Sequence, residues 1–330
     1  MKKKTKWILA GAGITAFSAA MIGVAAGVSR KISKFVVDTA LDREGPKPMK
    51  GTKNPNDSVV PEELSTELYE LSEKLKNSDC ETVEMIARDG EKLVGHWHHK
   101  EGDKRVIIAM HGWRSSWNKD FSVISDFWQN NDSSVLYVEQ RGQGESGGEY
   151  MGFGMIERFD CLDWIDWVNE RLDDSMPIYL AGISMGASTV LMTGGFDLPE
   201  NVCGIMADCG FTSAHAIWKH VVENNTHFSY NSRSKIVDDL CKKKIQVGSQ
   251  DYTTLDAMRE CKVPVLFVHG TDDTFVPVEM TYENYKACVA PKMLFVVPGA
   301  THAMSYLVDR EGYEKIVKEF WENYDSSNCI

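Results

Sequence analysis

Apolar and polar positions along the chain alternate between two patterns. Short apolar runs are typical of strands buried on both faces, and the segments between them carry apolar residues at helical spacing. The apolar runs cover residues 105–110, 134–138, 178–181, 202–207, 263–268 and 292–297. A hairpin over 81–97, turning at Asp89-Gly90, precedes them. This alternation predicts an α/β fold with a mainly parallel, doubly wound sheet and helices on both faces.

Three further segments complete the predicted organisation. Residues 45–61 form a linker that contains glycine and proline, and residues 62–77 form an amphipathic helix with four leucines at helical spacing. The interval 210–260 is too long for a plain crossover between two strands, so it predicts a small helical lid. The expected divisions are an N-terminal membrane segment (1–30), a linker with a flanking helix (31–78) and one α/β domain (79–330).

The N-terminus combines a basic start with an uncharged span. Four lysines lie among the first six residues, the span 7–29 carries no charge, and Arg30, Lys31 and Lys34 follow it. As a helix, the span would extend about 34 Å, enough to cross the hydrocarbon core of a bilayer. Since it is longer than the apolar region of a usual signal peptide, we predict an uncleaved single-pass anchor. Cleavage near Val24-Ala25-Ala26, giving a secreted protein, is the alternative.

Charge is distributed unevenly and limits the class of partner. Residues 1–50 carry ten Lys/Arg and three Asp/Glu, which gives them a net charge of +7. Because the whole chain has a net charge of −12, residues 51–330 carry −19. The lysines before the span favour a cytoplasmic N-terminus and therefore an extracellular domain. The acidic remainder argues against nucleic acid as a partner, whereas the basic end suits a membrane surface. The eight cysteines form no C-x-x-C pair and are interpreted as scattered core residues.

The most informative motif is the pentapeptide Gly182-Ile183-Ser184-Met185-Gly186. It lies between the strand-like run 177–181 and a helix-like run that begins at Ala187. A serine on such a strand-to-helix turn presents its hydroxyl as an exposed nucleophile. The two glycines leave room for backbone segments that approach closely. Ser184 is therefore the candidate nucleophile.

A base and an acid follow downstream, each where an apolar run ends. His302 follows the run 292–297, and its imidazole is the expected base because it titrates near neutral pH. Asp272 and Asp273 follow the run 263–268. Their spacing from His269 favours Asp273 as the acid that orients His302, with Asp272 as the alternative.

Five motifs in this order resemble the α/β-hydrolase superfamily over about residues 81–324, and they look closest to bacterial S33-type and BEM46-like esterases and lipases. The motifs are His111-Gly112-Trp113, Gln140-Arg141-Gly142-Gln143-Gly144-Glu145-Ser146, the serine pentapeptide, His269-Gly270 through Asp273 to Val276-Pro277, and Gly299-Ala300-Thr301-His302. Glu139 stands where such families usually have Asp at the end of the fourth strand. That residue is structural in the family, so the departure leaves the implied chemistry intact.

The resemblance implies a serine hydrolase that cleaves carboxylic esters through an acyl-enzyme, with Ser184, His302 and Asp273 as its triad. The backbone N–H groups of Met185 and Trp113 are the expected oxyanion hole, and the Trp113 indole is expected to line the acyl pocket or cover the loop. The expected partner is a small-molecule or lipid-like acyl substrate, with no metal and no cofactor. An aminopeptidase-like peptidase or an acyltransferase would use the same triad. The non-enzymatic alternative is a membrane-tethered binding module that has lost activity.

The remaining histidines are assigned structural or peripheral roles. His111 and His269 lie at strand ends, where a structural role is expected. His96 and His98 share one face of a strand beside His99, which indicates a solvated hairpin face, with a metal site as the alternative. Three more lie in the predicted lid, where they could line the entrance to the site: His215, His220 and His227.

Overall fold

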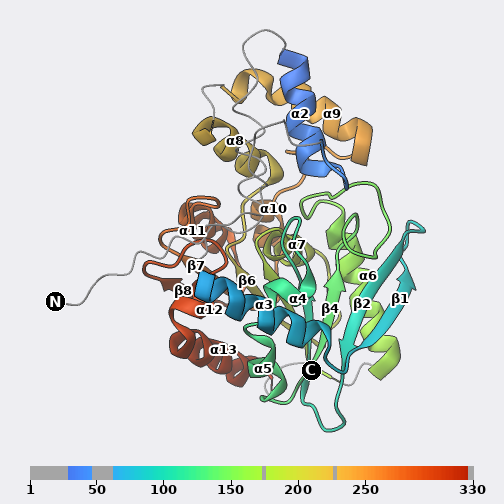
Figure 1. The fold of residues 1–330 in the computed structure, drawn as a ribbon, viewed down its shortest axis with the longest axis vertical. Coiled ribbons are helices and arrows are strands. Elements are labelled where there is room, and N and C mark those ends of the chain that lie inside the picture. The colour runs from blue at the N-terminus through green and yellow to red at the C-terminus, as the bar shows by residue number, and fades with distance from the viewer. Residues whose placement is uncertain (1–28, 47–61, 173–175, 226–228, 326–330) are drawn as a thin grey trace, which may run out of the picture.

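The computed structural model describes residues 29–46, 62–172, 176–225 and 229–325, and one eight-stranded sheet lies at its centre (Figure 1). The strands are β1 (Glu81–Ile86), β2 (Lys92–His98), β3 (Arg105–Met110), β4 (Ser133–Glu139), β5 (Ile178–Ile183), β6 (Val202–Asp208), β7 (Val265–Gly270) and β8 (Lys292–Val297). Their order across the sheet is β1-β2-β4-β3-β5-β6-β7-β8. Only the β1–β2 and β2–β4 pairs are antiparallel. The mainly parallel sheet expected from the apolar runs is confirmed.

Helices cover both faces of this sheet, which explains why its strands are continuously apolar. Strands β3, β4, β6 and β7 are buried at every position. One face is covered by α6 (Glu157–Leu172), α7 (Met185–Thr193), α10 (Thr254–Glu260) and α11 (Val278–Ala287). The other is covered by α3 (Glu62–Lys76), α4 (Trp117–Asp120), α5 (Ser125–Gln129), α12 (Ser305–Val308) and α13 (Arg310–Tyr324). The flanking helix expected over 62–77 is therefore α3, which buries Leu75.

A helical cap lies beyond one end of the sheet, at the top of Figure 1. It consists of α2 (Ser29–Leu41), α8 (Ala214–Asn225), the 3₁₀ turn η1 (Asn231–Arg233) and α9 (Ser234–Ile245). A shared apolar cluster joins these helices to the domain, and it includes Val37 of α2, Trp218 of α8 and Val237 of α9. The same cluster contains Met185 of the serine pentapeptide and Trp113, so the apolar cluster of the cap extends to the residue that follows Ser184.

Helix α2 is the part of the cap that the sequence analysis did not anticipate. The sequence pattern predicts a linker over residues 31–44, but Ser29–Leu41 form a helix whose apolar side chains lie at helical spacing. Because α2 directly follows the uncharged N-terminal span, its own apolar periodicity is difficult to separate from that span in the sequence. Ile32, Val36 and Leu41 are buried, and Lys244 of α9 pairs with Asp38 at 3.1 Å.

Two sequence expectations concern membrane crossing and cysteines. Across the described ranges, every helix is too short or too polar to span a bilayer. The anchor predicted over 7–29 falls almost wholly outside these ranges and stays a prediction.

Six cysteines are free thiols and five of these are buried, as expected of core residues. Cys203 is also a buried core residue, but it is disulfide-bonded and not a free thiol.

Candidate active site

Ser184 occupies a sharp turn between β5 and α7. Its φ of 57° and ψ of −115° are unusual for a residue with a side chain, and its N–H donates to the Asp208 carbonyl at 2.9 Å. The turn requires glycine on both sides. A Cβ on Gly186 would lie 1.8 Å from the Met110 carbonyl oxygen, and one on Gly182 would lie 2.3 Å from the Gly186 backbone. The close approach inferred from the two glycines is therefore present.

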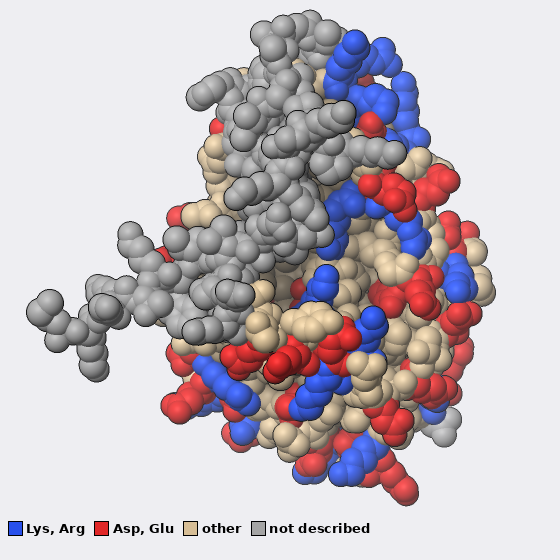
Figure 2. Space-filling view, in the orientation of Figure 1, with Lys and Arg blue, Asp and Glu red and all other residues tan. Residues whose placement is uncertain are grey.

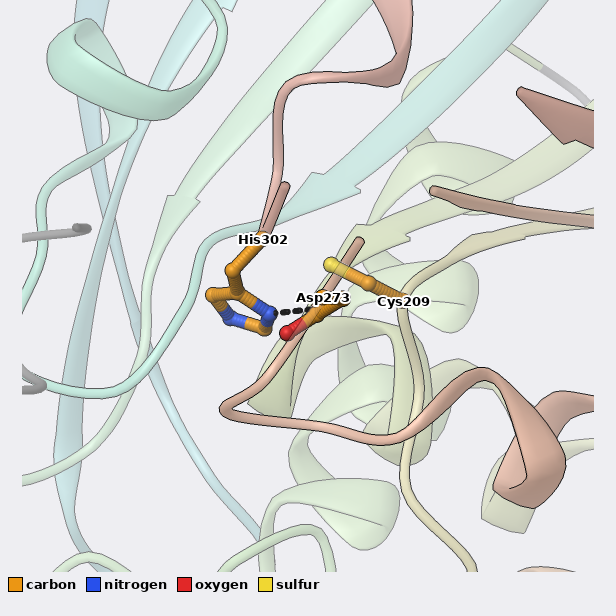
Figure 3. A group of neighbouring side chains, drawn as sticks. All are labelled: Cys209, Asp273 and His302. Atoms are coloured by element: carbon orange, nitrogen blue, oxygen red, sulfur yellow. Dashed lines mark hydrogen bonds and ion pairs between the residues drawn. The ribbon is translucent and has the colours of Figure 1, made fainter. Parts of the chain in front are cut away.

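Ser184, His302 and Asp273 lie in one hydrogen-bonded chain. His302 comes from the loop after β8, and its Nε2 lies 2.9 Å from Ser184 Oγ. Its Nδ1 lies 2.6 Å from Asp273 Oδ2, in the loop after β7 (Figure 3). All three residues are at most 7% exposed. The parallel topology brings these strand ends together although 118 positions separate the serine from the histidine.

The structure distinguishes the two candidate acids. Oδ1 of Asp273 accepts the N–H groups of Phe275 and Val276 at 2.9 Å each, which leaves Oδ2 directed at His302. Asp272 is exposed, and its carboxylate accepts the Thr271 hydroxyl at 2.9 Å instead. Only Asp273 of this pair therefore contacts the imidazole.

Nearby charges set the protonation of the Asp273–His302 pair. Burial alone would lower the pKa of His302, but the carboxylates of Asp273, Asp208 and Asp120 outweigh it and hold the pKa above its ordinary 6.5. Burial acts to raise the pKa of Asp273, but His302 and His269 outweigh it, so that pKa lies well below its usual range. Asp273 therefore stays ionised while His302 gains or loses a proton.

The two backbone amides that the sequence predicts as an oxyanion hole have no acceptor among the described residues. Within the described ranges, neither the N–H of Met185 nor that of Trp113 donates to a protein acceptor. The Trp113 loop is close to the serine, since a Cβ on Gly112 would lie 3.4 Å from Ser184 Cβ. Asp120 fixes this loop by accepting the Gly112 N–H at 2.6 Å.

Helix α2 holds the same loop from the other side. The Trp113 indole N–H donates to the Ala40 carbonyl at 2.9 Å, so the ring covers the loop and joins it to the helix. The Arg114 guanidinium donates to the carbonyls of Thr39, Asp42 and Arg43 at 2.6–3.0 Å. A cation at the carbonyl end of a helix is favourable, and here it fixes a residue whose φ is 53°. Sequence reasoning missed this contact because more than 70 positions separate its two sides.

Several of the other histidines form hydrogen bonds within the fold, whereas Nδ1 of His98 and Nδ1 of His215 are buried without such a partner among the described residues. His111 Nδ1 contacts the Gly112 carbonyl at 2.8 Å, and His269 Nε2 contacts the Val276 carbonyl at 2.9 Å, so both hold loops of the site. His96 is half-buried and lies 2.9 Å from Glu139, not on an open hairpin face as expected. His220 of the cap lies 3.0 Å from the Thr274 carbonyl, beside Asp273. His227 lies outside the described residues.

Metal-ligating side chains gather at one place in the described ranges. The group consists of Asp273 and His302 themselves, together with Cys209.

Comparison with known proteins gives this fold a family. A family model described as serine aminopeptidase, S33, matches residues 101–224. The Pyrococcus furiosus esterase Pf2001 covers 78% of this chain and 95% of its own, with a TM-score of 0.61 and 25% identity. The chain belongs to the α/β-hydrolase superfamily. The resemblance inferred from the five motifs is confirmed at this level.

Relatives of this α/β hydrolase occur in bacteria and plants. Bacillus subtilis YqkD is 29% identical over 198 residues, which cover 59% of this chain and 64% of YqkD. The Arabidopsis thaliana α/β hydrolase domain-containing protein WAV2 is also 29% identical over 198 residues, covering 58% of this chain and 61% of WAV2. The chain thus spans less than two thirds of the length of these two relatives.

Proposed function

We propose that this α/β hydrolase cleaves carboxylic esters through an acyl-enzyme intermediate. The observation that carries the proposal is the continuous hydrogen-bonded chain from Asp273 through His302 to Ser184 in a nearly closed site. The likeness to the esterase Pf2001 supports an ester as the substrate.

In the proposed mechanism, Ser184 Oγ attacks the substrate carbonyl while His302 Nε2 accepts its proton. The ionised Asp273 holds the Nδ1–H of His302 and stabilises the imidazolium that forms. His302 then donates the proton to the departing alcohol, leaving an acyl group on Ser184. A water deprotonated by His302 hydrolyses this acyl-enzyme and restores the serine.

The amides of Met185 and Trp113 are the proposed donors to the tetrahedral oxyanion. Met185 begins helix α7, so its N–H lies at the positive end of the helix dipole. Trp113 supplies the second donor from the loop held by Asp120 and α2. Losing one such donor typically lowers kcat by about 10²- to 10³-fold.

The S33 family match supports a second candidate, an aminopeptidase-like cleavage of amides. Paired substrates separate the two: p-nitrophenyl esters, the matching p-nitroanilides, and p-nitroanilides of free amino acids. We expect turnover of the esters with an initial burst of p-nitrophenol, which marks accumulation of an acyl-enzyme. Preferential turnover of anilides with a free α-amino group would instead favour the aminopeptidase.

The pH profile should report the raised pKa of His302. Only the neutral imidazole accepts the serine proton, so kcat/KM should fall as the pH decreases through this pKa. Because nearby carboxylates hold the pKa above 6.5, we expect half-maximal kcat/KM above pH 6.5, with a tenfold fall per unit at lower pH. Initial rates across pH 5–9 with a non-ionising ester measure this. A midpoint below pH 6 would contradict the assigned electrostatics.

Arg114 should affect catalysis through the position of the loop that carries Trp113, the proposed second donor to the oxyanion. We expect Arg114→Ala to lower kcat by about 10- to 100-fold with little change in KM, because only the transition state uses the Trp113 amide fully. Arg114→Lys should recover only part, since an ammonium cannot reproduce a guanidinium's contacts with three carbonyls. Arg88→Ala is the control, because Arg88 pairs with Asp163 away from the site. Equal losses in both alanine variants would indicate a general loss of stability.

We also propose that the N-terminal segment anchors the enzyme in the cell membrane, with the catalytic domain outside and a lipid-like acyl substrate. Helices α2 and α9 with η1 carry eight basic and three acidic side chains, although the chain as a whole is acidic. Figure 2 shows Lys and Arg gathered at the top, over α2 and α9. This charge suits an anionic membrane surface. Protease digestion of intact cells, with lysed cells as the control, tests the orientation.

A further inference from the structure

Cys209 places a thiol beside the proposed acid and base. It directly follows β6, and its sulfur, a carboxylate oxygen of Asp273 and a ring nitrogen of His302 lie within 4.8 Å of one another. Figure 3 shows the sulfur turned toward the Asp273–His302 pair. Cys209 is only 1% exposed, so its thiol is shielded from bulk solvent.

The position of this thiol is well fixed, and the proposed acyl transfer does not use it. The Cys209 backbone has a φ of 50°, and its N–H donates to the Val268 carbonyl at 2.9 Å. Burial raises the pKa of the Cys209 thiol well above its usual value. The sulfur is therefore protonated during hydrolysis and has no part in moving the serine proton.

Thiolate, imidazole and carboxylate together form a ligand set for Zn²⁺ and for softer ions such as Cd²⁺. In a tetrahedral zinc centre, ligand atoms lie about 3.4–3.6 Å apart, given metal–ligand bonds of about 2.0–2.3 Å. The sulfur is within reach of this spacing. His302 Nδ1 and Asp273 Oδ2, now 2.6 Å apart, would need to separate by about 0.8 Å. Each of the three side chains is close enough to contribute one bond.

We propose that Cys209, Asp273 and His302 form an inhibitory binding site for a thiophilic divalent cation, such as Zn²⁺ or Cd²⁺. The loss of activity rests on the proposed serine hydrolase mechanism, whereas cation binding does not. The Cys209 thiol proton goes to solvent as the metal–sulfur bond forms. The imidazole proton moves from Nδ1 to Nε2, exchanging through solvent, so that Nδ1 binds the metal. With Nε2 protonated, His302 cannot accept the proton of Ser184.

Metal-buffered titrations of the full chain test inhibition. Zn²⁺ should lower both ester hydrolysis and fluorophosphonate labelling of Ser184, and EDTA should restore both. Because binding releases the thiol proton, the inhibition constant should fall about tenfold per pH unit above the pKa of His302. Cys209→Ser should raise the inhibition constant for Zn²⁺ by about 10-fold or more. The rates of each variant are compared with that variant's own rate without metal. Cys241→Ser is the control because that buried cap thiol lies outside the group.

Cadmium gives a readout that does not depend on hydrolysis. Cd²⁺ bound to a thiolate absorbs in the ultraviolet, and this absorbance should appear in the wild type and in Cys241→Ser but not in Cys209→Ser. Cys209→Gly is a second variant, suited to the positive φ, if the serine variant does not fold. A Cys209-dependent absorbance without any esterase activity would support the metal site and contradict the proposed function. Equal inhibition and equal absorbance in wild type and both Cys209 variants would overturn the metal site.

Discussion

Replacing Ser184 with alanine is expected to lower kcat for ester hydrolysis by about 10⁶-fold, because losing the nucleophile removes the acyl-enzyme route. The variant should still fold, since the turn between β5 and α7 depends on Gly182 and Gly186. At position 184, alanine tolerates the positive φ about as well as serine. Initial rates with a p-nitrophenyl ester, together with circular dichroism of both proteins, measure the two effects.

Ser188→Ala is the matched control for this variant. Ser188 lies one turn further along α7, and its hydroxyl bonds with the backbone of Phe211. Its loss should lower the melting temperature while largely retaining kcat. If Ser184→Ala retained most of the activity, the nucleophile would have to be another residue.

Asp273→Asn should produce the second-largest loss, about 10⁴-fold in kcat. The amide can present its N–H to His302, which favours the tautomer whose Nε2 carries a proton and cannot act as a base. Asp272→Asn preserves size and removes the same charge one position away, yet its side chain faces solvent. We expect its kcat to remain within about twofold of wild type.

The two variants are compared by kcat at a pH well above the pKa of His302. A large loss in Asp272→Asn with a small one in Asp273→Asn would reverse the assignment of the acid. Small losses in both would direct attention to Asp208, whose buried carboxylate also raises the pKa of His302.

Local sequence patterns predicted the sheet and the elements around it, because strands covered by helices on both faces are apolar at successive positions. The apolar runs at 105–110 and 292–297 coincide with β3 and β8, and the others fall within a few residues of their strands. The serine elbow was predictable for a related reason. Its geometry excludes side chains at Gly182 and Gly186, so the constraint is visible within five residues.

The parts of the site that were not predicted depend on contacts between distant segments. The hydrogen bonds from Arg114 to the end of α2 join positions more than 70 residues apart. No local feature of the sequence around Arg114 predicts this contact. Asp120 fixes the loop that carries Trp113 from a helix of four residues, which is too short to show a periodic pattern. Cys209 was grouped with the core cysteines, because only the fold places its sulfur beside Asp273.

The central claim, an activated serine at position 184, is tested most directly by labelling with a fluorophosphonate probe. Wild type, Ser184→Ala and Ser188→Ala would be treated in parallel at a pH above the pKa of His302, and the modified peptide mapped by mass spectrometry. We expect one adduct, on Ser184, in wild type and Ser188→Ala, and none in Ser184→Ala. A folded wild-type protein that fails to react, or that reacts equally in Ser184→Ala, would contradict the proposed function.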